Sequence, residues 1–178
     1  MVPDSELDLA AQLNRGVTLR FAAVRKRTLM SAVLPVIAAA CASTPWQGTE
    51  RDPSQVAFAG ELGVDLAQME QVEPGLYVQD LVSGGGRAAG RTSRVWIHYI
   101  TWLPDGTIVD TNVGGEPFAF RLGEDEVIRG WDRAIAGMQI GGNRRLVVRP
   151  GLAYGSRGTA RVPPGTTLVF QVELVDTR

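Results

Sequence analysis

Side chains that act as nucleophiles, proton carriers or metal ligands are scarce in this sequence of 178 residues. It contains one histidine, His98, and one cysteine, Cys41, which excludes a site with several His ligands, an intramolecular disulfide and a Cys-x-x-Cys motif. A Ser-His-Asp triad would have to use His98, which stands in an apolar run where a packed structural role is the favoured interpretation. The only lysine, Lys26, lies in no Gly-rich phosphate-binding loop. We therefore expect neither a metal site nor a cofactor.

Two short motifs are interpreted as loops or turns, and the overall charge argues against one class of function. Gly84-Gly85-Gly86 loosely matches a dinucleotide-binding fingerprint, but no helical pattern follows it, so we interpret it as a hairpin loop. Glu124-Asp125-Glu126 is interpreted as a solvated turn before Val127 rather than as a metal-binding cluster. The 18 basic residues nearly balance the 19 acidic residues, which argues against a nucleic-acid-binding surface.

The remaining candidates for a functional site are aromatic and aliphatic side chains in separate segments of the chain. They are Tyr99, Phe118, Phe120, Val127, Ile128, Trp131, Tyr154 and Phe170. Such residues form either the lining of a concave binding site or an ordinary hydrophobic core, and the residue types alone favour the core. The elements that carry these residues, and their order along the chain, have to decide between the two alternatives.

Short strands separated by turn residues account for most of the chain after about residue 74. The expected strands are Leu76–Val82, Val95–Trp102, Ile108–Asp110, Phe118–Phe120, Arg144–Arg149 and Thr167–Val175. One short helix is expected at Trp131–Met138, bounded by Gly130 and by Gly141-Gly142. The last strand alternates, so that one of its sides carries Leu168, Phe170, Val172 and Leu174. Consecutive antiparallel strands with one helix predict an α+β domain of about 100 residues.

Seven segments between Val95 and Val175 follow the pattern of one family in order. They are Ile97-His98-Tyr99, Leu103-Pro104-Asp105-Gly106-Thr107, Glu116-Pro117-Phe118-Ala119-Phe120, Val127-Ile128-Arg129-Gly130-Trp131-Asp132, Gly137-Met138-Gln139-Ile140-Gly141, Ala153-Tyr154-Gly155-Ser156-Arg157-Gly158 and Val162-Pro163-Pro164-Gly165-Thr166-Thr167-Leu168-Val169-Phe170. On these segments the chain resembles the FKBP-type peptidyl-prolyl cis-trans isomerases. The resemblance implies a twisted antiparallel β-sheet wrapped around one short α-helix, with a proline-binding pocket between them. It also implies an enzyme that catalyses rotation of X-Pro peptide bonds.

The same resemblance implies a role for each residue of the pocket. Trp131 would form the floor, and the Ile128 backbone N–H and the Tyr154 hydroxyl would donate hydrogen bonds to a bound peptide. Asp110 occupies the position of the family's pocket aspartate. The walls would be formed by Tyr99, Phe118, Val127, Ile128 and Phe170. The implied partners are proline-containing polypeptides and macrolide inhibitors, and we expect the protein to be a monomer.

The chain departs from the family's pattern around the pocket. Val109 stands where a pocket phenylalanine is common, and the loops Thr111–Glu116 and Gly155–Pro163 are slightly shorter than usual. The first loop lacks an arginine that often pairs with the pocket aspartate. Arg161, in the second loop, is expected at the rim, where it would favour acidic residues beside the proline. The lost aromatic area predicts weaker proline packing. The alternative function is therefore a low-turnover proline-binding or chaperone module of the cell envelope.

The first part of the chain has the pattern of an export signal. The basic run Arg25-Lys26-Arg27 precedes a short apolar stretch, Thr28–Ala40, which is typical of a secretory signal peptide rather than of a membrane span. The small residues before Cys41 resemble a bacterial lipobox, in which the cysteine becomes the lipid-bearing mature N-terminus, although Ala38 replaces the usual leucine. Ordinary cleavage by signal peptidase is the alternative.

These patterns divide the chain into three parts. Residues 1–40 are expected to be an N-terminal extension and signal peptide, with the true start of translation near Val24. Residues 41–73 are expected to be a flexible tether and lead-in, and residues 74–178 the FKBP-type isomerase domain. We expect the mature protein in the periplasm or cell envelope, anchored to a membrane through a lipid on Cys41, where it would act on exported proteins.

Overall fold

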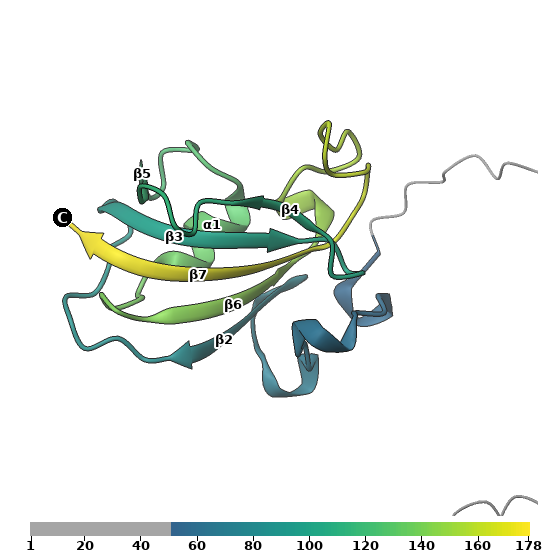
Figure 1. Cartoon of the computed structure of the whole chain (residues 1–178), viewed down its shortest axis with the longest axis horizontal. Coiled ribbons are helices and arrows are strands. Elements are labelled where there is room, and N and C mark those ends of the chain that lie inside the picture. Colours follow the sequence, from purple (N-terminus) through teal and green to yellow (C-terminus); the bar gives the residue numbers. More distant parts are fainter. Residues whose placement is uncertain (1–50) are drawn as a thin grey trace, which may run out of the picture. The chain divides into compact units, whose positions relative to one another are not determined.

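A seven-stranded antiparallel sheet and one short α-helix form the part of the chain that the computed structural model describes, residues 51–178 (Figure 1). The strands are β1 (Glu70–Glu73), β2 (Leu76–Val82), β3 (Arg94–Trp102), β4 (Ile108–Thr111), β5 (Phe118–Arg121), β6 (Asn143–Val148) and β7 (Leu168–Thr177). Their order in the sheet is β1-β2-β6-β7-β3-β4, and β5 also pairs with β3. The predicted α+β fold is confirmed. The predicted signal peptide and Cys41 lie outside the described residues.

The core lies between the sheet and the helix α1 (Arg129–Ile135), and it follows the alternation of β7. This strand is central, because it pairs with β6 on one edge and with β3 on the other. The side chains of β7 that are buried in this core are Leu168, Phe170, Val172 and Leu174. They pack with Trp131 and Ile135 from α1, so the alternation predicted for this strand is confirmed.

The ends of the helix differ from those that the sequence predicts. The prediction is Trp131–Met138, whereas α1 runs from Arg129 to Ile135. The helix begins earlier because the Ile128 carbonyl accepts a hydrogen bond from the Trp131 N–H at 2.9 Å, which closes the first turn. It ends earlier because Gly137 has a φ of 86°, in the left-handed region that glycine adopts without strain.

Gly130 lies inside the helix instead of bounding it. A residue with a side chain would not fit at this position. A Cβ at this position would come within 2.6 Å of Cγ1 of Val148, on β6. Glycine therefore lets the first turn of α1 approach the sheet closely. The neighbouring residue, Trp131, is held at the depth in the core that this approach sets.

We predict that Gly130→Ala lowers the free energy of unfolding. Overpacking of a core costs about 1–3 kcal/mol, whereas the gain in helix propensity is at most about 1 kcal/mol. Denaturant unfolding of the two proteins measures the difference. The matched control is Gly85→Ala, because a Cβ at Gly85 meets open space and its change should stay within about 0.5 kcal/mol. Equal midpoints for the two variants would show that the contact at Gly130 is not tight.

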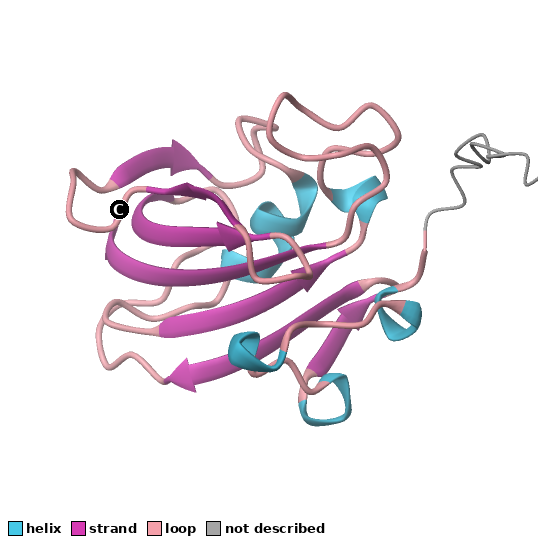
Figure 2. Cartoon of the chain, turned by 45° about the vertical axis from the view of Figure 1, so that its right-hand side comes forward, coloured by secondary structure: helices cyan, strands magenta, loops and turns pink. Residues whose placement is uncertain are grey.

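The segment before the sheet covers the opposite face of β6 and β7. It contains three short helical turns, at Pro53–Gln55, Gly60–Leu62 and Leu66–Gln68, which lie on the side of the sheet away from α1 (Figure 2). Its buried side chains, Leu62 and Met69, form a second apolar cluster with others from the sheet.

The described part of the expected tether and lead-in (residues 41–73) is packed against the sheet through the second cluster. From β6 and β7 this cluster takes Val147 and Val169, whose side chains point away from the first core. The Ala59 N–H donates to the Pro104 carbonyl at 2.8 Å, and the Arg145 guanidinium donates to the Gly63 carbonyl at 2.8 Å. The sheet itself begins at Glu70, before the boundary expected at residue 74.

No helix within residues 51–178 is long and apolar enough to cross a membrane.

Candidate functional site

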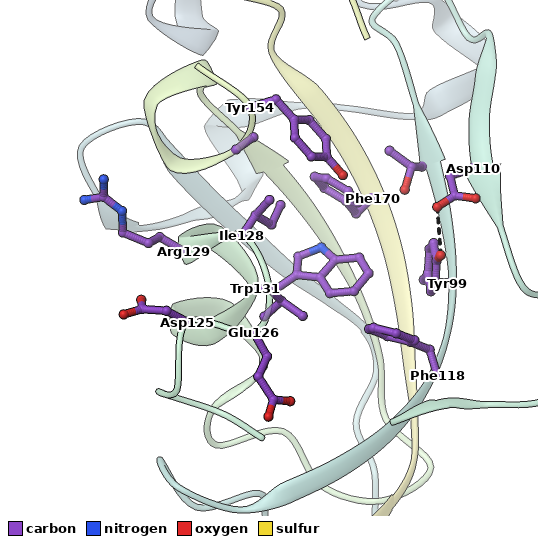
Figure 3. Close-up of a pocket in the computed structure, with 13 residues that line it drawn as sticks. Tyr99, Asp110, Phe118, Asp125, Glu126, Ile128, Arg129, Trp131, Tyr154 and Phe170 are labelled. Carbon is purple, nitrogen blue, oxygen red and sulfur yellow. Dashed lines mark hydrogen bonds between the residues drawn. The ribbon is translucent and has the colours of Figure 1, made fainter. Parts of the chain in front are cut away.

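A cavity of about 580 Å³ opens between the sheet and the start of α1 (Figure 3). Its lining includes the eight pocket residues that the family resemblance implied: Tyr99, Asp110, Phe118, Val127, Ile128, Trp131, Tyr154 and Phe170. Phe120, the other aromatic candidate, does not line the cavity and is buried in the core. The eight lining residues come from β3, β4, β5, β7, α1 and the loops before α1 and after β6. The sheet and helix thus bring segments that are distant in the sequence to one concave surface.

Trp131 lies at the centre of this lining. Its ring centroid is 5.0 Å from that of Tyr99, 5.5 Å from that of Phe170 and 6.4 Å from that of Phe118, all in edge-to-face arrangements. Only 6% of Trp131 is exposed, because the rest of the side chain is packed among these rings and against the core. Its indole ring is therefore a rigid apolar surface at the bottom of the cavity.

The walls differ from the floor in their exposure. Tyr99 is half-buried on β3, and Phe170 is fully buried on β7. Phe118, the first residue of β5, is 41% exposed, and Tyr154 is 40% exposed. Both of these partly exposed aromatic side chains border the same cavity, and exposed apolar groups that gather in one place are a feature of binding sites. The cavity therefore offers an apolar interior with aromatic edges.

The polar groups of the cavity centre on Asp110. The Tyr99 hydroxyl donates to Oδ2 of Asp110 at 2.8 Å, the bond drawn in Figure 3. Burial, the hydrogen bond to Asp110 and the charge of Asp110 raise the pKa of Tyr99 to about 12. Burial, and then the charge of Asp110, also raise the pKa of Tyr154. Both phenols are therefore neutral at physiological pH and keep their protons for donation.

We predict that Asp110→Asn lowers the pKa of Tyr99 from about 12, but not fully to its ordinary value, because burial remains the larger cause. Titration of the Tyr99 ring signals by NMR measures the shift. Since the pKa in the folded wild type lies above the unfolded value, the contribution of Tyr99 to stability is present below pH 10 and lost as the pH rises to about 12. In Asp110→Asn, the contribution of Tyr99 to stability should be lost at a lower pH than in the wild type. An unchanged pKa would mean that the carboxylate does not act on the phenol.

Two hydrogen-bond donors of residues that line the cavity are not used within the described part of the chain. The Ile128 carbonyl accepts the bonds that begin α1, but within residues 51–178 the Ile128 N–H has no acceptor. The Tyr154 hydroxyl likewise has no partner among the described hydrogen bonds. A carbonyl group that enters the cavity can therefore accept a bond from either donor without breaking an existing one.

Five further residues line the cavity that the sequence did not single out: Thr101, Asp125, Glu126, Arg129 and Ala153. Each adjoins or lies within two positions of a predicted site residue, which is the only signal that points to them. Asp125 has a φ of 54° in the predicted turn, and Oε2 of Glu126 accepts the Arg121 N–H at 2.9 Å. The turn interpretation of this acidic motif is confirmed. In the described part of the chain, no three His, Cys, Asp or Glu side chains are grouped as metal ligands.

The residues that depart from the family's pattern lie outside the cavity lining. Val109 is 8% exposed and belongs to the hydrophobic core. Arg161 is not among the residues that line the cavity, and its expected preference for acidic residues beside the proline stays a prediction. Its Nη1 instead donates to the Val109 carbonyl at 3.3 Å, which draws the side chain toward β4. His98, which precedes Tyr99 on β3, also lies outside the lining. It stands opposite Glu173 of β7.

Comparisons with known sequences agree with this arrangement. A family model described as FKBP-type peptidyl-prolyl cis-trans isomerase matches residues 85–175. FK506-binding protein 4 of Neurospora crassa is 46% identical over 106 residues, which are 60% of this chain and 23% of that protein. A peptidyl-prolyl cis-trans isomerase of Saccharomyces cerevisiae is 41% identical over 126 residues, 71% of this chain and 31% of that protein. The chain therefore spans less than a third of the length of these relatives.

Solved structures of similar proteins come from bacteria as well. A peptidyl-prolyl cis-trans isomerase of Pseudomonas syringae is 35% identical, with a TM-score of 0.56, over 62% of this chain and 80% of that one. FkpA of Escherichia coli is 38% identical, with a TM-score of 0.57, over 62% of this chain and 52% of that one. Over 62% of the chain, the fold is thus similar to that of proteins whose sequences are also related.

Proposed function

The chain belongs to the FKBP-type peptidyl-prolyl cis-trans isomerases, and we propose on this basis that it catalyses rotation of X-Pro bonds in polypeptides. The observation that carries the proposal is the cavity over Trp131, whose lining contains every pocket residue that the family resemblance implied. Uncatalysed rotation is slow, taking about tens to hundreds of seconds, so such an activity speeds a step that limits folding.

The proposed mechanism needs no covalent step. The barrier to rotation, about 18–20 kcal/mol, comes from the partial double bond between carbon and nitrogen. When the bond twists, this resonance is lost, the carbonyl oxygen becomes less negative, and the amide needs less solvation. An apolar cavity therefore destabilises the planar amide more than the twisted one. The fixed aromatic walls favour a bound shape in which the proline ring is held while the preceding carbonyl turns.

Each group of the cavity has a part in this proposal. Trp131 would contact the proline ring, with Tyr99 and Phe170 closing the space beside it. The Ile128 N–H and the Tyr154 hydroxyl would hold carbonyl groups of the substrate main chain. Asp110 would fix Tyr99 through their 2.8 Å hydrogen bond. We also propose that the protein acts as a monomer.

The experiment is a protease-coupled assay of an X-Pro peptide with the full chain. We expect the wild type to accelerate cis-to-trans conversion in proportion to its concentration. The reference is the double variant Trp131→Ala, Tyr154→Phe, which removes the floor and one hydrogen-bond donor. A wild-type rate no higher than that of the double variant would contradict the proposal.

The alternative, a low-turnover proline-binding or chaperone module, is favoured by one observation. Val109 is buried in the core and contributes no aromatic wall to the cavity. Burial of a proline would then lose apolar contact area. The same assay separates the two functions, because the alternative predicts binding of the X-Pro peptide without acceleration.

Several relatives are named FK506-binding proteins, and we propose this macrolide as a competitor for the cavity.

We further propose that the protein is an exported bacterial form, anchored in the cell envelope by a lipid on Cys41. The support is the basic run and short apolar stretch that precede this cysteine in the sequence. Its substrates would then be exported polypeptides that fold after transport. Intact mass of the protein isolated from cells tests the proposal: a lipid adduct on Cys41 supports the anchor, and an unmodified mature N-terminus contradicts it.

A further inference from the structure

One edge of β3 is shared by two strands that do not meet. β5 pairs with its first half, where Ile97 stands opposite Phe118. β4 pairs with its second half, where Ile100 stands opposite Thr111. Between these two ladders, the backbone around Tyr99 faces no strand on that edge. Backbone groups in such a gap need other partners, because an unpaired N–H or C=O away from water is costly.

The side chain of Asn112 fills this gap. Its Oδ1 accepts the Tyr99 N–H at 2.8 Å, and its Nδ2 donates to the Ile97 carbonyl at 3.0 Å. In an antiparallel partner strand, these two bonds would come from the N–H and the C=O of two successive peptide groups. A single carboxamide thus takes the place of the missing stretch of strand.

The same carboxamide also holds the end of the loop between β4 and β5. Its Nδ2 donates a second bond, to the Glu116 carbonyl at 3.1 Å, just before Pro117 and Phe118. Both Nδ2 protons and the Oδ1 atom are therefore used. One planar group thus joins the backbone of β3, at Ile97 and Tyr99, to the backbone at Glu116, two residues before Phe118.

We propose that Asn112 is a positioning residue of the cavity, which fixes the spacing between the wall residues Tyr99 and Phe118. Their ring centroids are 6.2 Å apart, with an interplanar angle of 73°, and both rings contact Trp131. Without the carboxamide, these three hydrogen bonds are lost, and the strand pairing that ends at Ile97 and Phe118 is left to set the distance between the two walls. The effect on turnover rests on the proposed isomerase function, whereas the effect on Tyr99 does not.

The test is Asn112→Ala in the full chain. We expect kcat/KM for an X-Pro peptide to fall about 10-fold, because small displacements of groups that shape a transition state reduce rates steeply. We also expect the pKa of Tyr99 to fall below its value of about 12, since a displaced ring is more hydrated and bonds less well to Asp110. NMR titration of the Tyr99 ring measures this second effect.

Two controls separate positioning from a general loss of stability. Val113→Ala changes the next residue, whose side chain is exposed, and should leave both measurements unchanged. Val147→Ala removes a buried side chain on the opposite face of the sheet, so it should lower stability while leaving kcat/KM and the pKa of Tyr99 unchanged. If Asn112→Ala does not fold, Asn112→Asp is used, because it keeps the shape and the acceptor but removes both donated bonds.

The outcomes distinguish the inference from the proposed function. A folded Asn112→Ala variant with kcat/KM within twofold of the wild type and an unchanged Tyr99 pKa overturns the positioning role. So does a folded Asn112→Asp variant of undiminished kcat/KM. If the wild type shows no isomerase activity, the proposed function fails, and the Tyr99 titration in Asn112→Ala alone decides whether Asn112 holds the cavity wall.

Discussion

Replacement of Trp131 by alanine is expected to lower kcat/KM for an X-Pro peptide about 100-fold, because it removes the floor against which the other groups are oriented. The indole ring contacts Tyr99, Phe118 and Phe170, and only 6% of the residue is exposed. Without it, the cavity deepens, water enters, and a proline ring has no fixed surface. The twisted amide then loses the apolar surroundings that favour it over the planar amide.

The stability of the variant has to be measured beside its activity, because truncation of a buried tryptophan costs about 3–5 kcal/mol. Trp131→Phe keeps an aromatic floor and is expected to retain most of the activity. Trp102→Ala is the matched control, since this tryptophan packs in the second cluster, on the far face of the same sheet. It should lower stability but not kcat/KM. Near-normal turnover in folded Trp131→Ala would place the reaction outside this cavity.

Removal of residues 1–69 is expected to lower the free energy of unfolding by about 3–6 kcal/mol, from two large buried apolar side chains that it takes away. These are Leu62 and Met69, which cover Val147 and Val169 on the face away from the cavity. Because whole domains are stable by only about 5–15 kcal/mol, the loss is a large share of the total. Comparison of the full chain with one that begins at Glu70, by denaturant unfolding, measures it.

Single substitutions test the same expectation without shortening the chain. Leu62→Ala should cost about 2–5 kcal/mol, whereas Gln68→Ala, at an exposed position of the same segment, should change stability by less than about 0.5 kcal/mol. Both variants should keep the wild-type kcat/KM at temperatures where they are folded, because the segment does not line the cavity. Equal stability of Leu62→Ala and the wild type would show that the segment does not stabilise the sheet.

Elements with regular patterns were predictable from the sequence. The alternation of β7 identifies both the strand and its buried side, because side chains on a strand face opposite sides in turn. The eight cavity residues were predictable only together, since their order matches that of a known family; hydrophobicity alone pointed to a core. The helix ends were missed because Gly130 is inside α1 for reasons of packing against Val148, which no local pattern records.

Features that depend on contacts between distant segments were not predictable. The turns at residues 53–68 have no helical or strand periodicity, so nothing in the sequence shows that Leu62 meets Val147. The bonds of Asn112 to Ile97 and Tyr99 join a loop side chain to the backbone of another strand, for which no spacing rule exists. The bond of Arg161 to the Val109 carbonyl likewise depends on how its loop folds back toward β4, which the sequence does not show.

The position of β7 at the centre of the sheet has a consequence for the time at which the domain acquires its structure. β3 and β6 meet only through this strand, which is also the last of the seven to be synthesised. While residues 168–177 are still within the ribosome, β3 and β6 have no common partner, and neither apolar cluster is complete. The sheet and both clusters can therefore be completed only after residues 168–177 have left the ribosome, so we expect the domain to acquire its full structure late in synthesis.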